Sequence, residues 1–258
     1  MTDGGDHMNT AVQDKGAVIV TGASRGIGAA IAERLASDGY GVVVNYSADS
    51  EGAESVVSAI RANGGRAVPV RADVASEDAV EAMFDQAKEQ MDPLTALVNN
   101  AGIVGELAPM DEQHADMLTR LMQVNVVGSM MCAKHAIRAL STAHGGQGGS
   151  IVTIASIAAK GMADVHGVVP YEATKGALVS FARGLSNEVA AEGIRSNSVS
   201  PGAIDTIAVA NPEVRDMGEH SPVARIGRPD EVAAAVSWLI SPEASYVTGS
   251  DITVSGGL

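Results

Sequence analysis

The stretch Thr21-Gly-Ala-Ser-Arg-Gly-Ile-Gly28 joins an apolar run, residues 17–21, to a segment in which Ile27, Ile31 and Leu35 recur with helical spacing. The run is rich in β-branched residues and apolar on both faces, which predicts a buried parallel strand. Glycines between a strand and a helix permit a tight turn beside free helix N–H groups, so the stretch predicts a phosphate-binding turn. A glycine-rich turn by itself is weak support, and the spacing here is not the commoner Gly-x-Gly-x-x-Gly.

The same alternation of strand and helix continues along the chain. Further β-branched runs lie at residues 42–45, 67–70, 96–98, 151–154, 194–199 and 252–254. The repeated order predicts the α/β class, with a single doubly wound Rossmann-type domain and a seven-stranded, mostly parallel sheet. We expect residues 1–14 to form a flexible tail, residues 15–258 the domain, and residues 203–228 to include a short, polar substrate lid.

Composition narrows the functional classes. The formal net charge is −14 and aromatic residues make up 3% of the chain, which argues against nucleic-acid binding. Cys132 is the single cysteine, so no intramolecular disulfide forms and no oxidising compartment is required. The N-terminus has no long apolar run. We therefore expect a cytoplasmic protein without a membrane anchor.

A second cluster of polar residues follows the run at residues 151–154. Tyr171 and Lys175 lie four apart at the start of a helical segment, so both face the same side of the helix. A nearby ammonium favours the phenolate and should lower the pKa of the tyrosine toward neutrality. Ser156 precedes this pair at a predicted strand end, where ligands of such sheets bind. The three residues together predict acid–base chemistry in a crevice.

These motifs resemble those of the short-chain dehydrogenase/reductase family. Thr21–Gly28 is similar to its cofactor loop, and Asn99-Asn-Ala-Gly102 is similar to its second signature. The resemblance runs from about Gly16 to Leu258 and is closest to 3-oxoacyl-carrier-protein reductases and glucose-1-dehydrogenase-like enzymes. It implies hydride transfer between a nicotinamide dinucleotide and a small carbonyl or alcohol substrate.

The resemblance also implies a role for each catalytic residue. Tyr171 donates a proton to the substrate oxygen in reduction, and Ser156 orients that oxygen. Lys175 holds the nicotinamide ribose and tunes Tyr171. Asn125 supports a water in a proton relay, with helix bending alone as the alternative. The residues implied to contact the cofactor are Gly22, Ser24, Arg25, Gly26, Ile27, Gly28, Asn45, Tyr46, Ser47, Asp73, Val74, Asn99, Ala101, Tyr171, Lys175, Pro201, Gly202, Ile204 and Thr206.

The choice of cofactor depends on the end of the second strand. The segment there reads Val44-Asn-Tyr-Ser47, without the carboxylate that accepts hydrogen bonds from an adenosine ribose. Arg25 can pair with a phosphate instead. We therefore expect NADP(H). Asp49 lies close by in sequence and keeps NAD(H) open. The resemblance further implies Asp73 and Val74 beside the adenine and Asn99 and Ala101 along the ribose, with structural roles as alternatives for Asp73 and Asn99.

The substrate is less well determined. Ser156 and Tyr171 are 15 residues apart, about two more than is common in the family, and the extra residues fall within 158–170. This segment should form one pocket wall, built from Met162, Val165, Val168 and Val169, and favours a partly apolar ligand. His166 could contact substrate or be an ordinary loop histidine. An NAD-dependent sugar or polyol dehydrogenase and a non-catalytic dinucleotide sensor are the alternative functions.

Two further expectations concern metals and assembly. No group of His, Cys and Asp residues has metal-ligand spacing, so we expect no catalytic metal. The family resemblance implies a homotetramer. Residues 111–140 give modest support, because Met117, Leu121, Met130 and Met131 place apolar side chains on more than one face of a predicted helix.

Overall fold

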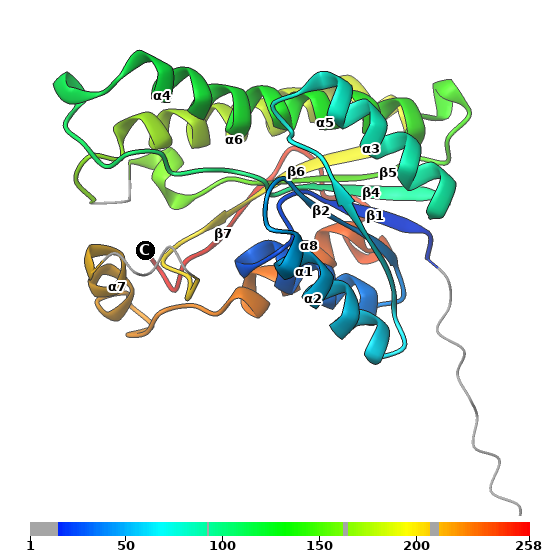
Figure 1. Ribbon diagram of the computed structural model, residues 1–258, viewed down its shortest axis with the longest axis horizontal. Helices are drawn as coiled ribbons and strands as arrows, with labels where there is room; N and C mark the ends of the chain where they lie inside the picture. Colours follow the sequence, from blue (N-terminus) through cyan, green and yellow to red (C-terminus); the bar gives the residue numbers. More distant parts are fainter. Residues whose placement is uncertain (1–14, 92, 162–164, 207–211) are drawn as a thin grey trace, which may run out of the picture.

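Seven strands form a single sheet between two layers of helices in the computed structural model, which describes residues 15–91, 93–161, 165–206 and 212–258 (Figure 1). The strands are β1 (Ala17–Val20), β2 (Gly41–Tyr46), β3 (Arg66–Arg71), β4 (Leu94–Asn99), β5 (Gly149–Ile154), β6 (Ile194–Pro201) and β7 (Asp251–Val254). Their order is β3-β2-β1-β4-β5-β6-β7, and every neighbouring pair is parallel. The predicted fold class is confirmed, with the sheet wholly rather than mostly parallel.

The strand order reverses at β1, which pairs with β2 on one side and with β4 on the other. Chain connections leave β1 and β4 in opposite directions at such a point, so a crevice opens at the carboxyl ends of these strands. The glycine-rich stretch follows β1 and the Asn-Asn-Ala-Gly segment follows β4. The two motifs found in the sequence therefore meet at the topological switch point.

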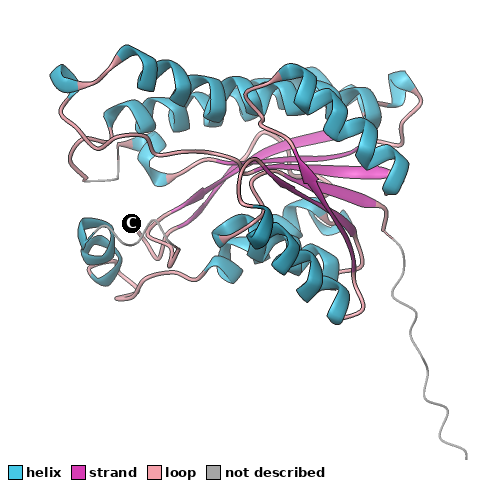
Figure 2. Cartoon of the chain, in the orientation of Figure 1, coloured by secondary structure: helices cyan, strands magenta, loops and turns pink. Residues whose placement is uncertain are grey.

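Helices cover both faces of the sheet (Figure 2). One face carries α1 (Gly26–Ser37), α2 (Ser50–Ala62) and α8 (Pro229–Ile240). The other face carries α3 (Glu77–Gln90), α5 (Gly128–Leu140) and α6 (Val169–Val189), with α4 (Ala115–Leu121) alongside. The short helix α7 (Pro212–Glu219) lies apart from both layers, near the carboxyl ends of β6 and β7.

The strand residues alternate between two hydrophobic cores. In β1, Val18 and Val20 pack against α1 and α8, whereas Ala17 and Ile19 pack against the α3 and α5 side. Both faces of a central strand are thus buried, as the apolar runs predicted. Each fully buried Val or Ile contributes about 1.5–3 kcal/mol. Cys132 lies in the second core, and burial raises the pKa of its thiol to about 12.

The segment expected to be one long helix over residues 111–140 is interrupted. α4 ends at Leu121, a π-helical turn occupies Met122–Val127, and α5 begins at Gly128. Such turns insert an extra residue into a helix and commonly mark functional positions. Asn125 lies within this turn and is fully buried.

Two of the sequence predictions concern segments that lie wholly or partly outside the described residues. The predicted tail, residues 1–14, and residues 207–211 of the predicted lid lie outside them. The described part of the lid contains α7. No described helix combines the length and the hydropathy that crossing a membrane requires.

Candidate active site

A cavity of about 430 Å³ lies at the carboxyl ends of the central strands. It brings together eight residues predicted from the sequence, namely Ile27, Ser156, Tyr171, Lys175, Pro201, Gly202, Ile204 and Thr206. A larger cleft of about 1400 Å³ opens at the opposite edge of the sheet, beside Leu94, Gly149 and Ile194 at the strand starts. That cleft holds none of the predicted site residues, so the smaller cavity is the candidate active site.

Tyr171 and Lys175 project from the first turns of α6, which starts at Val169 with Pro170. The Lys175 ammonium lies 5.4 Å from the centre of the Tyr171 ring. Its Nζ donates a 2.9 Å hydrogen bond to the carbonyl of Ile154, the last residue of β5. Ser156, two residues further along, forms a hydrogen bond with Tyr171, and its Oγ also accepts one from the Ala158 amide at 3.1 Å. The helix and strand end thus place two hydroxyls beside one buried ammonium.

Burial has the largest effect on the pKa values of Tyr171 and Lys175. It raises the pKa of Tyr171 to about 12, and the hydrogen bond from Ser156 only partly counters the rise. Burial also lowers the pKa of Lys175 to about 8. The expected lowering of the Tyr171 pKa by Lys175 is therefore wrong for the chain without its cofactor. Removal of the phenol from water costs the phenolate more than the neighbouring ammonium returns.

The side chain of Asn125 forms its hydrogen bonds with other groups of the protein. Its Oδ1 accepts a hydrogen bond from the Ile103 amide at 2.8 Å, and its Nδ2 donates to the Ile103 carbonyl at 2.9 Å and to Thr174 Oγ1 at 3.0 Å. Thr174 donates in turn to the Tyr171 carbonyl at 2.7 Å. The side chain of Asn125 therefore links the π-helical turn to the helix that bears Tyr171. Sequence reasoning missed Thr174, which stands within the Tyr171–Lys175 turn.

The glycine loop is shaped by contacts that exclude larger residues. Gly22 has φ +62°, and a Cβ there would lie 2.9 Å from the Cα of Ala101. A Cβ on Gly28 would lie 2.4 Å from the Gly22 carbonyl oxygen. Thr21 Oγ1 accepts hydrogen bonds from the amides of Asn100 and Ala101 at 2.9 and 3.0 Å. The loops after β1 and β4 are thus locked together at the switch point.

The start of α1 suits an anion. In the described structure its first turn has no acidic residue, and the Arg25 side chain makes no capping hydrogen bond. The N–H groups of the turn are therefore free of side-chain partners, and the helix dipole favours negative charge there. A Cβ on Gly26 would lie 3.4 Å from Thr206 Cγ2, so the Pro201–Thr206 loop faces this turn. These residues fit a dinucleotide whose pyrophosphate meets α1.

The end of β2 differs in one respect from the prediction. Asn45 is buried; its Nδ2 donates to the carbonyls of Val70 and Ala72, and its Oδ1 accepts from the Gly22 amide at 3.1 Å. Its side chain therefore holds the glycine loop and cannot offer the hydrogen bonds expected for a ribose or phosphate. Tyr46 is half-buried and Ser47 exposed, so both remain available.

Three charged residues lie at or near this end of the site. Asp49, the reason for keeping NAD(H) open, accepts a 3.0 Å hydrogen bond from the Gly52 amide and caps α2. Arg71, which sequence reasoning missed, stands opposite Tyr46 at the end of β3 and donates a 3.2 Å hydrogen bond to the Ser47 carbonyl. A basic residue directly after the third apolar run was the available signal. Arg25 is exposed.

The residues expected along the adenosine are largely engaged within the protein. Asp73 accepts from the Ala75 amide at 3.0 Å and pairs with Arg120 at 2.8 Å. Burial works to raise its pKa, but these two contacts outweigh it and the pKa is lowered. Val74 is buried. Asn99 donates to the Ser129 carbonyl at 3.0 Å, and its Oδ1 is buried without a partner among the described residues. A cofactor contact for these residues stays a prediction.

The pocket walls agree only in part with the expectation. Val165 and Val168 line the cavity, whereas Val169 is exposed and does not. Met162 lies outside the described residues. His166 is exposed and is absent from the described lining. The lining residues that sequence reasoning missed include the large apolar side chains of Ile103, Val104, Leu107, Ile157, Val214 and Met217.

α7 is amphipathic rather than simply polar. Val214 and Met217, three residues apart, line the cavity, while Glu213, Arg215 and Asp216 are exposed. Residues at i and i+3 share one helix face, and this spacing was the signal that the description of a polar lid overlooked.

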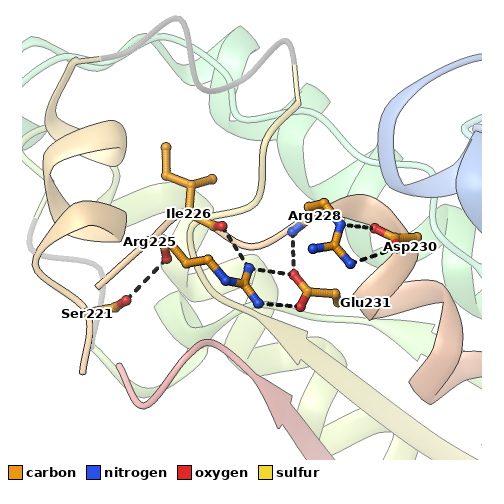
Figure 3. A network of polar contacts seen from close by, with 6 residues as sticks. All are labelled: Ser221, Arg225, Ile226, Arg228, Asp230 and Glu231. Carbon is orange, nitrogen blue, oxygen red and sulfur yellow. Dashed lines mark hydrogen bonds and ion pairs between the residues drawn. The ribbon is translucent and has the colours of Figure 1, made fainter. Parts of the chain in front are cut away.

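The chain after α7 is anchored by a polar network (Figure 3). Arg225 makes two hydrogen bonds to the Glu231 carboxylate, at 2.9 and 2.6 Å, and Glu231 also accepts from the Arg228 amide at 2.7 Å. These contacts lower the pKa of Glu231 to about 2. Gly227, between the two arginines, pairs with Ile204 in an isolated parallel bridge. The network therefore fixes the strand segment that supports the Pro201–Thr206 loop.

Comparisons with known proteins agree with this geometry. Residues 22–258 match a family model described as enoyl-(acyl carrier protein) reductase. The chain is 41% identical over 243 residues to the uncharacterized oxidoreductase YgfF of Escherichia coli, covering 93% of this chain and 98% of that protein. It is 37% identical to glucose 1-dehydrogenase 2 of Bacillus subtilis, covering 93% of each. It is 36% identical to a 3-oxoacyl-[acyl-carrier-protein] reductase of Synechocystis, covering 93% of this chain and 95% of that protein.

Solved structures are equally similar. A short-chain dehydrogenase of Burkholderia cenocepacia in complex with NADP has a TM-score of 0.87 and 35% identity, covering 95% of this chain and 98% of that one. A 7α-hydroxysteroid dehydrogenase complexed with NADH and 7-oxo glycochenodeoxycholic acid has a TM-score of 0.87 and 33% identity, covering 95% and 94%.

The chain belongs to the short-chain dehydrogenase/reductase family. It is an oxidoreductase that acts on alcohol or carbonyl substrates with a nicotinamide dinucleotide cofactor. The family resemblance deduced from the glycine loop and the Asn-Asn-Ala-Gly segment is confirmed.

Proposed function

We propose that this protein is an NADP(H)-dependent oxidoreductase in which Tyr171 is the general acid and base. The observation that carries the proposal is the meeting of Ser156, Tyr171 and Lys175 in one cavity beside the loop that ends at Thr206. When bound, the nicotinamide supplies the hydride for reduction or accepts it in oxidation. The glycine loop, the start of α1 and the Pro201–Thr206 loop are the groups that hold the dinucleotide.

Ser156 and Tyr171 bind the substrate oxygen and transfer the proton. Ser156 and Tyr171 bind the carbonyl oxygen through their hydroxyls, and Tyr171 donates its proton to that oxygen as the carbonyl carbon gains the hydride. The product alcohol has then gained two electrons and two hydrogens in total. In oxidation the phenolate of Tyr171 takes the proton back. A pKa of about 12 keeps Tyr171 protonated at neutral pH, which suits the reductive direction.

Lys175 and Asn125 serve this acid in different ways. The Lys175 ammonium stabilises the negative charge that develops on Tyr171 as its proton leaves, and it is placed for a ribose hydroxyl as well. Asn125 is a positioning residue, since its side chain bonds Ile103 and Thr174 rather than facing the cavity. The family resemblance implies that Asn125 supports a relay water. In this proposal the Asn125 side chain does not hold that water, and other groups do.

The preference for NADP(H) rests on charge at the end of β2. Arg25 and Arg71 lie in the two segments that flank Tyr46 and Ser47, and a guanidinium binds a phosphate through paired hydrogen bonds. The Asp49 carboxylate accepts a hydrogen bond from the Gly52 amide at the start of α2. This contact reduces the repulsion between the carboxylate and a 2′-phosphate. Both observations support recognition of the 2′-phosphate of NADP(H).

The test is a fluorescence titration of the protein with NADPH and with NADH. We expect NADPH to bind at least about tenfold more tightly, equivalent to about 1.4 kcal/mol. Arg25→Gln should weaken NADPH binding by about tenfold and leave NADH binding within twofold, because one charged hydrogen-bond pair is lost. Arg34→Gln, remote from the loop on the outer face of α1, is the matched control. Equal affinity for both cofactors would refute the preference.

A homotetramer in the cytoplasm completes the proposal. Met122 and Val127 of the π-helical turn are each 44% exposed, which supports coverage of this helix by a second copy. Light scattering on the purified chain measures the assembly directly.

A further inference from the structure

We infer that the substrate is an uncharged cyclic or branched ketone, or the matching secondary alcohol, whose hydrocarbon body fills an apolar cavity around Tyr171. This inference rests on the proposed function and names its substrate class. It excludes sugars, free carboxylic acids and phosphorylated acyl carriers as the preferred substrates.

Three separate segments contribute large apolar side chains to the walls of the cavity. The loop after β4 contributes Val104 and Leu107, the segment between β5 and α6 contributes Ile157 and Val168, and α7 contributes Val214 and Met217. Apolar groups therefore surround the carbonyl site from several directions. A carbonyl flanked by carbon on both sides, that is a ketone, matches such walls better than an aldehyde on a polar chain.

The apolar lining continues to the mouth. Val104 and Leu107 are 39% and 48% exposed while they also line the cavity. Large apolar side chains that stay exposed at the rim of a cavity are expected where an apolar ligand covers them. A phosphorylated or carboxylated arm leaving through this mouth would meet no compensating cation among the described residues at the rim.

The described lining of the cavity carries little charge. Across the described lining, Lys175 is the single charged residue, and no Asp, Glu, Arg or His is present. The Lys175 ammonium already donates to the Ile154 carbonyl. A carboxylate or a set of sugar hydroxyls placed here would lose its hydration without gaining partners, which is costly.

The volume sets the size of the ligand. The cavity holds about 430 Å³ and also includes Ile27, Gly202 and Thr206, the end that receives the nicotinamide in the proposed function. A cavity of about 150 Å³ accommodates a benzene-sized ring. Two such rings fit, one of them the nicotinamide, with room for short alkyl substituents on the other.

The first experiment compares matched ketones with the protein and NADPH. Cyclohexanone and tetrahydropyran-4-one have the same shape and differ in one ring oxygen. The neutral 4-methylcyclohexanone and the anionic 4-oxocyclohexanecarboxylate differ in charge. We expect kcat/KM to rise about fourfold for each added methylene, to fall on introduction of the ring oxygen, and to fall at least about a hundredfold for the carboxylate. Equal or better turnover of the ring ether or the carboxylate would overturn the inference, and so would oxidation of glucose with NADP⁺ at a rate equal to or above that of cyclohexanol.

A pair of variants ties the preference to the wall. Val214→Thr replaces a lining methyl with a hydroxyl, and Val223→Thr makes the same change at an exposed residue outside the described lining. Val214→Thr should lower kcat/KM for 4-methylcyclohexanone about fivefold through KM, with unchanged NADPH affinity and thermal midpoint. Val223→Thr should change none of these. Identical behaviour of the two variants would contradict the inference.

Failure of the inference and failure of the proposed function give different results. Tyr171→Phe should abolish reduction of every ketone while NADPH still binds. If polar ketones are preferred and Tyr171→Phe is inactive, the substrate class alone is wrong. If Tyr171→Phe retains full activity, or no carbonyl is reduced, the proposed function is wrong. In that case calorimetry still decides the class of pocket, because cyclohexanecarboxamide should bind and cyclohexanecarboxylate should not.

Discussion

Tyr171 and Lys175 have pKa values displaced in opposite directions, to about 12 and about 8. We expect the rate of ketone reduction to fall as pH rises through about 8, because Lys175 then loses the charge that stabilises the forming phenolate. The rate of alcohol oxidation should instead rise with pH, because it requires deprotonated Tyr171. Steady-state kcat/KM profiles in both directions between roughly pH 6 and pH 10 measure this.

Parallel profiles in the two directions would contradict this assignment. Lys175→Arg provides the control, since a guanidinium keeps its charge across the same range. Reduction by that variant should lose its decline above pH about 8 even if its overall rate is lower.

For single residues, the sequence predicted which side chains form the site better than it predicted their hydrogen-bond partners. Tyr171, Lys175 and Ser156 were found by spacing because a helix turn and a strand end have fixed geometry. The bonding partners of Asn45 and Asn125 were not predicted, although a structural role for Asn125 had been kept as the alternative. Both side chains bond backbone groups of segments more than 20 residues away in sequence, and a single-chain pattern carries no record of such partners.

Among the elements, the β1–α1 unit depends most strongly on small residues. Gly28→Ala should destabilise the fold by about 1–3 kcal/mol and weaken dinucleotide binding, because its Cβ would lie 2.4 Å from the Gly22 carbonyl oxygen. Gly184→Ala is the matched control: Gly184 is exposed on α6, and nothing lies within 4 Å of the added Cβ. It should stabilise by about 0.5–1 kcal/mol. Urea denaturation measures both, and destabilisation of equal size would refute the packing argument.

The ion pair between Arg225 and Glu231, in the segment that links α7 to α8, leads to a separate prediction. Glu231→Gln removes the charge that binds Arg225 and should raise the cofactor dissociation constant about threefold, since the bridge at Ile204 and Gly227 loses its anchor. The pKa of Glu231 is about 2, so the ion pair is lost only as pH falls through that value and persists at neutral pH. Asp230→Asn, which removes the neighbouring pair with Arg228, is the control and should leave cofactor affinity unchanged.

Elements were predictable where one periodicity prevails and less so where function intervenes. The seven apolar runs became the seven strands. Burial on both faces left few alternatives for central strands such as β1, β5 and β6. The long predicted helix is broken by the π-helical turn at Asn125, and the lid proved amphipathic at Val214 and Met217. In both places the side chains contact segments that are distant in sequence: Asn125 bonds Ile103 and Thr174, and α7 lines the cavity.

Over the whole molecule, topology followed from the alternation of strands and helices, and the site followed from topology. The reversal of strand order at β1 brings the segments after β1 and β4 together, and Asn100 and Thr21 meet there although 79 residues separate them. Substrate class depends on which apolar side chains those connections aim at the cavity. The sequence does not reveal this until the fold is known.

The single cysteine provides a way to observe this molecule without knowing its substrate. Cys132 is fully buried in the core beneath α5, so a thiol-specific reagent can modify it only when that core opens. Labelling in native buffer should be slower than in urea by a factor of about 1,000 or more. Saturating dinucleotide at 100 times its Kd should slow labelling about a further hundredfold. The ratio of labelling rates with NADPH and with NADH then reports cofactor choice, whereas rapid labelling of the native chain would reveal local opening of α5.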